Sequence, residues 1–125
     1  MYTGKIRSFT DLNAWKEGHK LVLEIYRITK LFPLDEKFGL IDQMRRCSVS
    51  ITSNIAEGFS RKSKKEKAQF LYMSLGSITE LQNQLLIVKD LGYISKGDFA
   101  KIANQTVVVS KLANGLIKSA KAFNT

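Results

Sequence analysis

The chain has 125 residues, of which 44% are hydrophobic and 25% are charged, a composition typical of a globular domain with a buried core. A single cysteine excludes an internal disulfide and no apolar run is long enough to span a membrane, so we expect one cytoplasmic domain over residues 1–125. Twenty Lys and Arg against eleven Asp and Glu give a net charge of +9, which favours a polyanionic partner such as RNA or DNA. A basic surface that serves only solubility is the alternative.

The first predicted helix runs from about Asp11 to Leu31. Ser8 or Thr10 supplies its N-cap, and Pro33 ends it because proline disfavours helical backbone in the preceding residue. Its apolar stripe recurs at steps of three and four residues and comprises Leu12, Trp15, His19, Val22, Ile25, Tyr26 and Thr29. The lone histidine is expected to be a core or interface side chain, since metal binding would need partners that the sequence lacks.

The second predicted helix runs from about Glu36 to Ala56, and Gly58 is placed as its C-terminal stop. One face is apolar and comprises Leu40, Met44, Cys47, Ile51 and Ile55. A file of polar residues lies on the flank beside it, formed by Gln43, Arg46, Ser50, Asn54 and Glu57. A continuous polar file next to a core face is unusual for a helix that only needs to pack.

The third and fourth helices each begin with a capping box. Ser63 and Glu66 form the first box and Ser95 and Asp98 the second, while Gly92 stops the third helix. Because the connections between the predicted helices are short, sequential helices must be antiparallel. The predicted fold is therefore all-α, an antiparallel up-down-up-down four-helix bundle.

Several apolar residues fall outside the helical stripes, and a bundle of this size cannot bury all of them. The excess favours a homo-oligomer with a sizeable interface, although isolated exposed apolar residues are also common. These residues are Leu21, Leu23, Ile28, Leu71, Leu75, Leu86, Ile87, Val108 and Leu112.

The polar file predicts a seam between the second and third helices. Residues equidistant from the turn around Ser60 and Arg61 should face each other, so we expect Arg46 to pair with Glu80, an arrangement that suits the planar guanidinium. The hydrogen bonds around this pair would be completed by Gln43, Ser50, Asn54, Ser77 or Gln84. Glu57 also belongs to the predicted seam. We interpret the seam as a structural device that fixes helix register; a ligand or catalytic site is the alternative.

A dense basic run surrounds the turn between the second and third helices. Cations at a helix N-terminus oppose the helix dipole, so their placement favours phosphate contact over helix stability. The run has no interleaved aromatic residue, which predicts backbone-driven, salt-sensitive binding with little sequence specificity. The predicted nucleic-acid-binding residues are Arg61, Lys62, Lys64, Lys65 and Lys67, joined by Arg45 if it projects outward. A solvated charged turn is the alternative.

No motif for catalysis stands out. The sequence has no Ser-His-Asp order, no phosphate-binding glycine loop and no metal-ligand spacing. We therefore expect no enzymatic activity, no catalytic residues, no metal and no cofactor.

Several motifs follow one another in order along nearly the whole chain. Among them are Gly39-Leu40-x-x-Gln43-x-Arg45-Arg46, Ser50-Ile51-x-x-Asn54-Ile55-Ala56-Glu57-Gly58, and Gly76-Ser77-x-x-Glu80-Leu81-x-x-Gln84-Leu85. In these motifs the chain resembles the four-helix bundle proteins encoded in the intervening sequences of bacterial 23S rRNA genes. Cys47 and Ser74 depart from the alanine that is more usual in the family.

The resemblance implies a cyclic homo-oligomer, often a pentamer, with no attached enzyme activity. The family includes or resembles the accessory variability protein of diversity-generating retroelements, which binds nucleic acid and a reverse transcriptase. The expected function is thus a non-enzymatic oligomer that binds RNA or DNA through phosphate contacts. The alternative is a protein-interaction scaffold or an accessory subunit for an enzyme such as a reverse transcriptase.

Overall fold

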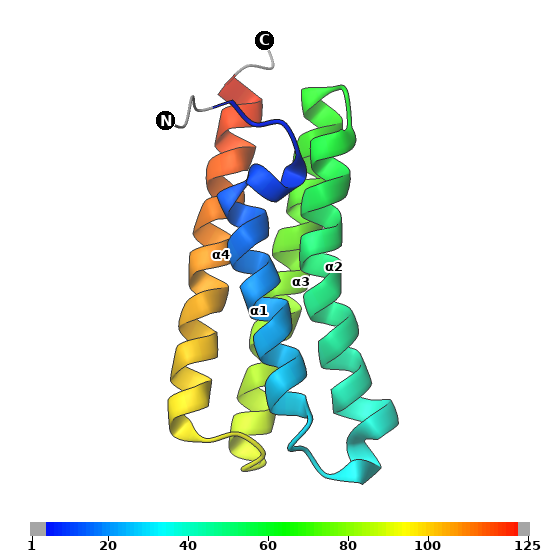
Figure 1. The fold of residues 1–125 in the computed structure, drawn as a ribbon, viewed down its shortest axis with the longest axis vertical. Coiled ribbons are helices and arrows are strands. Elements are labelled where there is room, and N and C mark those ends of the chain that lie inside the picture. The colour runs from blue at the N-terminus through cyan, green and yellow to red at the C-terminus, as the bar shows by residue number, and fades with distance from the viewer. Residues whose placement is uncertain (1–4, 123–125) are drawn as a thin grey trace.

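The computed structural model describes residues 5–122, and their helices form an up-down-up-down bundle (Figure 1). Its four long helices are α1 (Asn13–Thr29), α2 (Asp42–Ser60), α3 (Lys64–Asp90) and α4 (Lys96–Ala122). Helices that follow one another in sequence pack together, and α1 also packs against α4, which closes the bundle. The predicted all-α architecture is confirmed, and the described part of the chain contains no strand.

The buried face of α1 is rotated about the helix axis relative to the predicted stripe. Tyr26 is 39% exposed and His19 is exposed with its ring stacked on Trp15, so His19 is not a core residue of the bundle, and its other predicted role, at an interface, stays a prediction. Gly18 explains the rotation, because a Cβ there would lie only 3.0 Å from Cγ2 of Thr52 on α2. At this point the two helices are in tight contact through small residues, which a stripe of large side chains does not mark. The buried residues of α1 are Ala14, Gly18, Leu21, Ile25, Ile28 and Thr29.

Two short turns precede α2 and delay its start. A 3₁₀ turn (η2, Leu34–Glu36) leads into a π-helical turn (η3, Lys37–Ile41) that contains non-helical backbone at Gly39. The carboxylate of Glu36 accepts a hydrogen bond from the backbone N–H of Leu40, which stabilises this irregular entry. Regular helix therefore begins at Asp42, later than the predicted Glu36.

Gly58 does not end α2, which continues to Ser60, so its prediction as a helix stop is wrong. A Cβ at Gly58 would lie 3.2 Å from Cβ of Phe70 and 3.3 Å from the carbonyl oxygen of Lys67. The glycine is therefore placed where α3 lies close against α2, and its small size permits that approach.

The predicted caps of α3 and α4 are confirmed. Oγ of Ser63 accepts a hydrogen bond from the backbone N–H of Glu66 at 3.1 Å, and Ser95 does the same for Asp98 at 3.1 Å. Gly92 adopts a φ of 78°, and Tyr93 donates its backbone N–H to the carbonyl of Val88 at 2.9 Å. This six-to-one hydrogen bond after a left-handed glycine is the Schellman arrangement that ends α3.

The core runs the length of the bundle and contains side chains from all four helices. Its largest fully buried members include Leu21, Met44, Ile51, Ile78, Leu81, Ile102 and Val109. Within the described residues, no helix is long and apolar enough to cross a membrane.

A network of ion pairs joins α1 to α4 at the surface. The carboxylate of Glu24 accepts hydrogen bonds from Arg27 on its own helix and pairs with Lys101 on α4. Nη2 of Arg27 lies 2.8 Å from Oδ1 of Asp98. The hydrogen bonds from Lys101 and Arg27 hold the pKa of Glu24 below its usual value, and Arg27 lowers the pKa of Asp98 in the same way.

We predict that Glu24→Gln lowers the free energy of unfolding at neutral pH by about 1 kcal/mol. A carboxylate with a lowered folded pKa stabilises the fold above its unfolded pKa, and this contribution is lost as the pH falls through the folded pKa. The deficit of the variant should therefore shrink below about pH 4 in urea denaturation. Asp90→Asn, at the exposed end of α3, is the control, and a deficit of equal size at acidic and neutral pH would contradict the assignment.

Candidate functional site

The topology gathers three separate segments at one end of the bundle. Figure 1 shows the N-terminal segment, the turn between α2 and α3 and the C-terminal part of α4 at this end. We call this region, residues 5–11, 57–67 and 115–119, the basic end. The opposite end comprises residues 27–42 and 86–98.

Charge is distributed unevenly between the two ends. Among the described residues, the opposite end carries five cations and five carboxylates, whereas the basic end carries eight cations and three carboxylates. The eight cations are Lys5, Arg7, Arg61, Lys62, Lys64, Lys65, Lys67 and Lys118, and the carboxylates are Asp11, Glu57 and Glu66. The excess of positive charge is therefore local to the basic end and extends beyond the predicted basic run.

Two of the predicted phosphate-binding residues are held against the protein. Nη2 of Arg61 lies 3.1 Å from the carboxylate of Glu57, and its Cζ lies 4.7 Å from the ring centroid of Phe70. Nζ of Lys67 donates to the backbone carbonyl of Phe59 at 2.8 Å and lies 5.5 Å from the centroid of that ring. These contacts fix the two charges near the turn and shape the surface around them.

The other three lysines of the run lie around the start of α3. Lys62 and Lys65 are exposed, whereas Lys64 is half-buried. Their ammonium groups add positive charge at a helix N-terminus whose first turn is capped by Ser63. The run therefore presents a basic surface made of these three lysines beside the two cations that contact the protein, Arg61 and Lys67.

Arg45 does not belong to this surface. Its Nε donates to Oγ1 of Thr29 at 2.9 Å, and its Cζ lies 4.7 Å from the ring centroid of Tyr26. It precedes Arg61 by sixteen residues of the same helix, a separation of about 24 Å. The prediction that Arg45 joins the basic run is wrong, because the side chain packs between α1 and α2.

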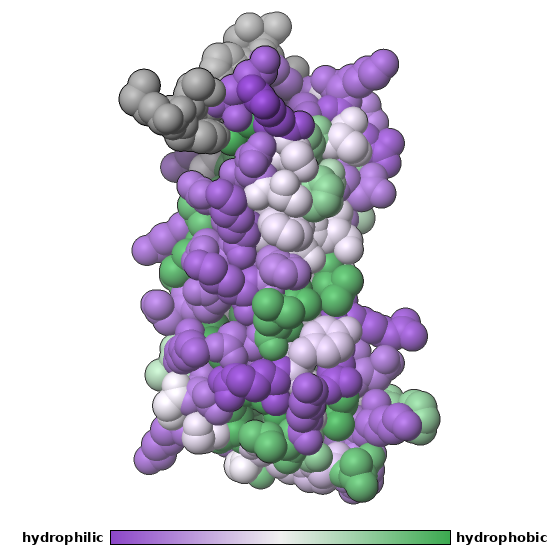
Figure 2. All heavy atoms as spheres, in the orientation of Figure 1, coloured by the Kyte–Doolittle hydropathy of each residue, from purple (hydrophilic) through white to green (hydrophobic). Residues whose placement is uncertain are grey.

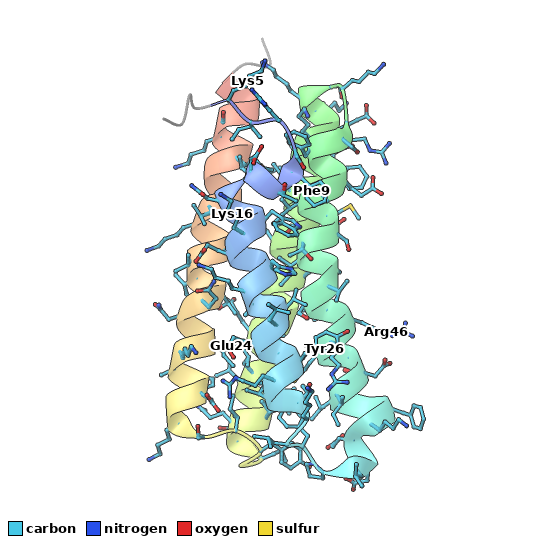
Figure 3. All side chains as sticks on the ribbon, in the orientation of Figure 1. Lys5, Phe9, Lys16, Glu24, Tyr26 and Arg46 are labelled. Carbon is cyan, nitrogen blue, oxygen red and sulfur yellow. The ribbon has the colours of Figure 1, made fainter. Side chains whose placement is uncertain are left out.

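Arg46 does not pair with Glu80, so this central contact of the predicted seam is wrong. Its side chain is 81% exposed, points away from the bundle (Figure 3), and its Nε lies 3.1 Å from Oδ1 of Asp42 on the same helix. Arg46 and Glu80 border the same surface hollow without pairing, and the hollow is also lined by Gln43, Cys47 and Ser50. A guanidinium in solvent avoids the desolvation that burial beside a carboxylate would require.

A seam of small polar groups nevertheless joins α2 to α3. Oγ of Ser50 donates to Oγ of Ser77 at 2.7 Å, and Oγ of Ser74 donates to the carbonyl of Ile51 at 2.9 Å. Sγ of Cys47 lies 3.0 Å from the carbonyl oxygen of Ser77. Ser50 and Ser77, which were both expected to complete the hydrogen bonds of an Arg46–Glu80 pair, thus bond to each other instead, and the donors of the seam are uncharged.

Of the other predicted seam residues, Glu80 bridges the helices because its carboxylate accepts a hydrogen bond from the thiol of Cys47, whereas the remaining ones do not. Gln43 is exposed, Asn54 donates to the carbonyl of Ser50 on its own helix at 2.9 Å, and Glu57 pairs with Arg61. Gln84 is buried, and its Oε1 has no hydrogen-bond donor among the described residues. The seam is therefore shorter than predicted and centred on Ser50 and Ser77.

The thiol of Cys47 is buried within this seam. Burial, together with the hydrogen bond of its Sγ to the carboxylate of Glu80 at 3.4 Å, raises the pKa of Cys47 to about 12. A thiol with this pKa is almost entirely protonated at neutral pH and is a poor nucleophile. The seam therefore combines uncharged hydroxyl, thiol and carbonyl groups with the carboxylate of Glu80, an arrangement that suits helix pairing. It lacks the close guanidinium–carboxylate pair on which the ligand-site alternative depended.

A hollow of about 250 Å³ opens at the basic end, next to the basic run. Its walls come from the end of α2, the start of α3, the end of α4 and the residue before α1. Three lysines of the basic run border it, namely Lys62, Lys64 and Lys67. Its walls are otherwise mostly apolar and include Leu12, Ile55, Phe59, Leu71 and Leu116.

Sequence reasoning missed the aromatic and terminal components of this site. Phe59 and Phe70 flank the basic run rather than interleave with it, yet each ring lies under a cation of the run. Lys5 and Lys118 join the site only because the topology brings both ends of the chain to the turn. The flanking position of the two phenylalanines was the one available signal.

Comparison with known proteins agrees with this fold. Residues 10–115 match the family model described as 23S rRNA-intervening sequence protein. Among solved structures, the chain is similar to a protein of unknown function from the S23 ribosomal protein family of Bacteroides thetaiotaomicron, with a TM-score of 0.77 and 23% identity. The similarity covers 84% of this chain and 95% of that chain, and at this identity it shows the fold alone. No significantly similar protein was found among curated proteins.

We predict that Cys47 of the folded protein resists alkylation by iodoacetamide near pH 8. The reactive species is the thiolate, and an ordinary cysteine has a pKa of about 8.5, well below that of this buried thiol. Mass spectrometry should show slow modification that accelerates when urea unfolds the protein. A Cys47→Ala, Ser53→Cys double variant carries an exposed thiol on the same helix and is the control. Equal rates for the two thiols would contradict the burial.

Proposed function

Since the chain belongs to the 23S rRNA-intervening sequence protein family, we propose that it is a non-enzymatic, cytoplasmic homo-oligomer that binds RNA or DNA through its basic end. The observation that carries the proposal is the uneven charge of the bundle. Eight cations face three carboxylates at the basic end, while charges balance at the opposite end. A localised excess of cations attracts a polyanion to that end.

The contacts are made to phosphate groups. Exposed lysines such as Lys62 and Lys65 reach phosphate oxygens as flexible point charges, while Arg61 and Lys67 supply a fixed positive field. Such contacts carry no sequence information and release counterions, so binding is salt-dependent and weakly sequence-specific.

Assembly into a homo-oligomer is supported by the apolar surface that the bundle leaves exposed. Figure 2 shows hydrophobic side chains grouped on the lower half of the visible face. Among the described residues, the large apolar side chains that are more than half exposed include Leu23, Leu31, Leu34, Phe38 and Met73. By contrast, Leu21, Ile28 and Leu71, which fell outside the predicted stripes, are buried in the bundle itself. A cyclic assembly, a pentamer by the family resemblance, would repeat the basic end and raise avidity for a long polyanion.

The second candidate function is a protein-interaction scaffold, or an accessory subunit for a nucleic-acid enzyme such as a reverse transcriptase. It is favoured by the connection between α1 and α2, where Leu34 is 89% exposed and Phe38 is 88% exposed. Large apolar side chains this exposed are typical of contact surfaces between proteins. In this case the basic end would be dispensable.

We predict that the triple variant Lys62→Glu, Lys64→Glu, Lys65→Glu loses binding to labelled RNA and duplex DNA by at least about a hundredfold at low salt. The substitutions reverse the charge of the basic end, so phosphate groups are repelled. Fluorescence anisotropy measures the affinity, and circular dichroism checks that the bundle is intact.

The matched control reverses three exposed lysines of the opposite end: Lys30→Glu, Lys37→Glu and Lys96→Glu. This variant makes the same change in net charge. If binding occurs at the basic end alone, the variant should retain most of its affinity for RNA and duplex DNA. Equal losses in the two triple variants would show that net charge alone governs binding. Unchanged binding by the first variant would favour the scaffold.

A further inference from the structure

We propose that the hollow at the basic end holds one unpaired base of a single-stranded nucleic acid, while the adjoining phosphates contact the lysines at its rim. This inference rests on the proposed function and adds a preference for unpaired strands. It also replaces the expectation from sequence that bases are not contacted.

The hollow has the volume and lining of a site for one small, partly apolar group. Its volume of about 250 Å³ lies near the lower limit for small-molecule sites in proteins. The apolar part of its lining comes from three helices and the residue that precedes α1, so the site exists only in the folded bundle. These walls are formed by Leu12, Ile55, Leu71 and Leu116.

An aromatic ring lies in the wall closest to the cations. Phe59 borders the hollow, and its backbone carbonyl and ring are both held by Lys67. The side chain of a residue at a helix end is thereby fixed beside the basic run. Single-strand-binding proteins combine these two elements, an aromatic surface for bases and cations along the backbone path.

The rim is complementary to the phosphates on either side of such a base. Lys62, Lys64 and Lys67 all border the hollow, and no carboxylate is among the described residues that line it. A purely apolar ligand would make no use of these cations, whereas a nucleotide matches both the apolar walls and the basic rim. The hydrogen-bonding edge of the base can remain at the open mouth, in contact with water.

A duplex does not suit the same hollow. Its base faces are stacked on one another, and only phosphates and groove edges are available to a protein. A duplex would therefore touch the lysines at the rim and leave the apolar walls unused. An unpaired strand gains the additional contact, so the geometry points to preference for a single strand.

The test compares a short oligouridylate with an abasic phosphate–sugar oligomer of the same length, each in ribose and deoxyribose form. The two sugars distinguish RNA from DNA as the source of the base. We expect the strand with bases to bind roughly tenfold more tightly than the abasic strand in at least one sugar. Fluorescence competition at constant salt measures the ratio.

The variant Ser119→Phe locates the contact. Ser119 is exposed on α4 and borders the hollow, so an aromatic ring there fills it without changing any charge. We expect the ratio between the two strands to fall to about one, while the abasic strand binds as before. Asn104→Phe introduces the same ring at an exposed position fifteen residues earlier on α4, about 22 Å away, and should retain the full ratio.

The outcomes separate this inference from the proposed function. Tight but equal binding of both strands by the wild-type protein would overturn the base site and leave phosphate binding intact. Failure to bind either strand would overturn the proposed function itself. If Ser119→Phe still bound the oligouridylate roughly tenfold more tightly than the abasic strand, the base would contact another surface. If that variant does not fold, Phe59→Leu replaces it, and an unchanged ratio there overturns the role of the ring.

Discussion

The short connection between α2 and α3 is the constraint on which the rest of the structure depends. Only residues 61–63 separate the two helices, so α2 and α3 must be antiparallel neighbours. Gly58 then allows α3 to pass close to α2, because a side chain there would press on Phe70 and the backbone of Lys67. The same turn carries the basic run and determines the end of the bundle at which it lies.

The hairpin is joined mainly by small uncharged groups, and the guanidinium of Arg46 beside them lies in solvent. The hydroxyls of Ser50, Ser74 and Ser77 form hydrogen bonds across the interface between α2 and α3, with lengths of 2.7–2.9 Å. A hydroxyl is a small group, so each one brings little polar surface into the core. A buried guanidinium–carboxylate pair would have cost more desolvation than its attraction returns in many proteins. The arginine beside the seam is accordingly exposed, and positive charge accumulates where the chain meets solvent at the turn.

The elements that depend on local chemistry were predictable from the sequence, whereas those that depend on packing between helices were not. The serine caps and the glycine that ends α3 follow from neighbouring residues, and they were correct. The predicted buried face of α1 was wrong because Gly18 packs tightly against Thr52, and small residues carry no hydrophobic signal. Arg45 was misplaced for a related reason, since helical phase does not show that Tyr26 lies opposite it. The basic end itself required the topology, which adds residues 5–11 and Lys118 to the run.

The most direct test of the central claim is the salt dependence of nucleic-acid binding. The affinity of the purified protein for labelled RNA and duplex DNA is measured across a salt series, with the mass of the protein determined in the same buffer. Phosphate binding by the basic end predicts that the logarithm of the affinity for duplex DNA falls linearly with the logarithm of salt, by about 0.9 for each phosphate neutralised. An affinity that does not change between low and high salt would contradict the account.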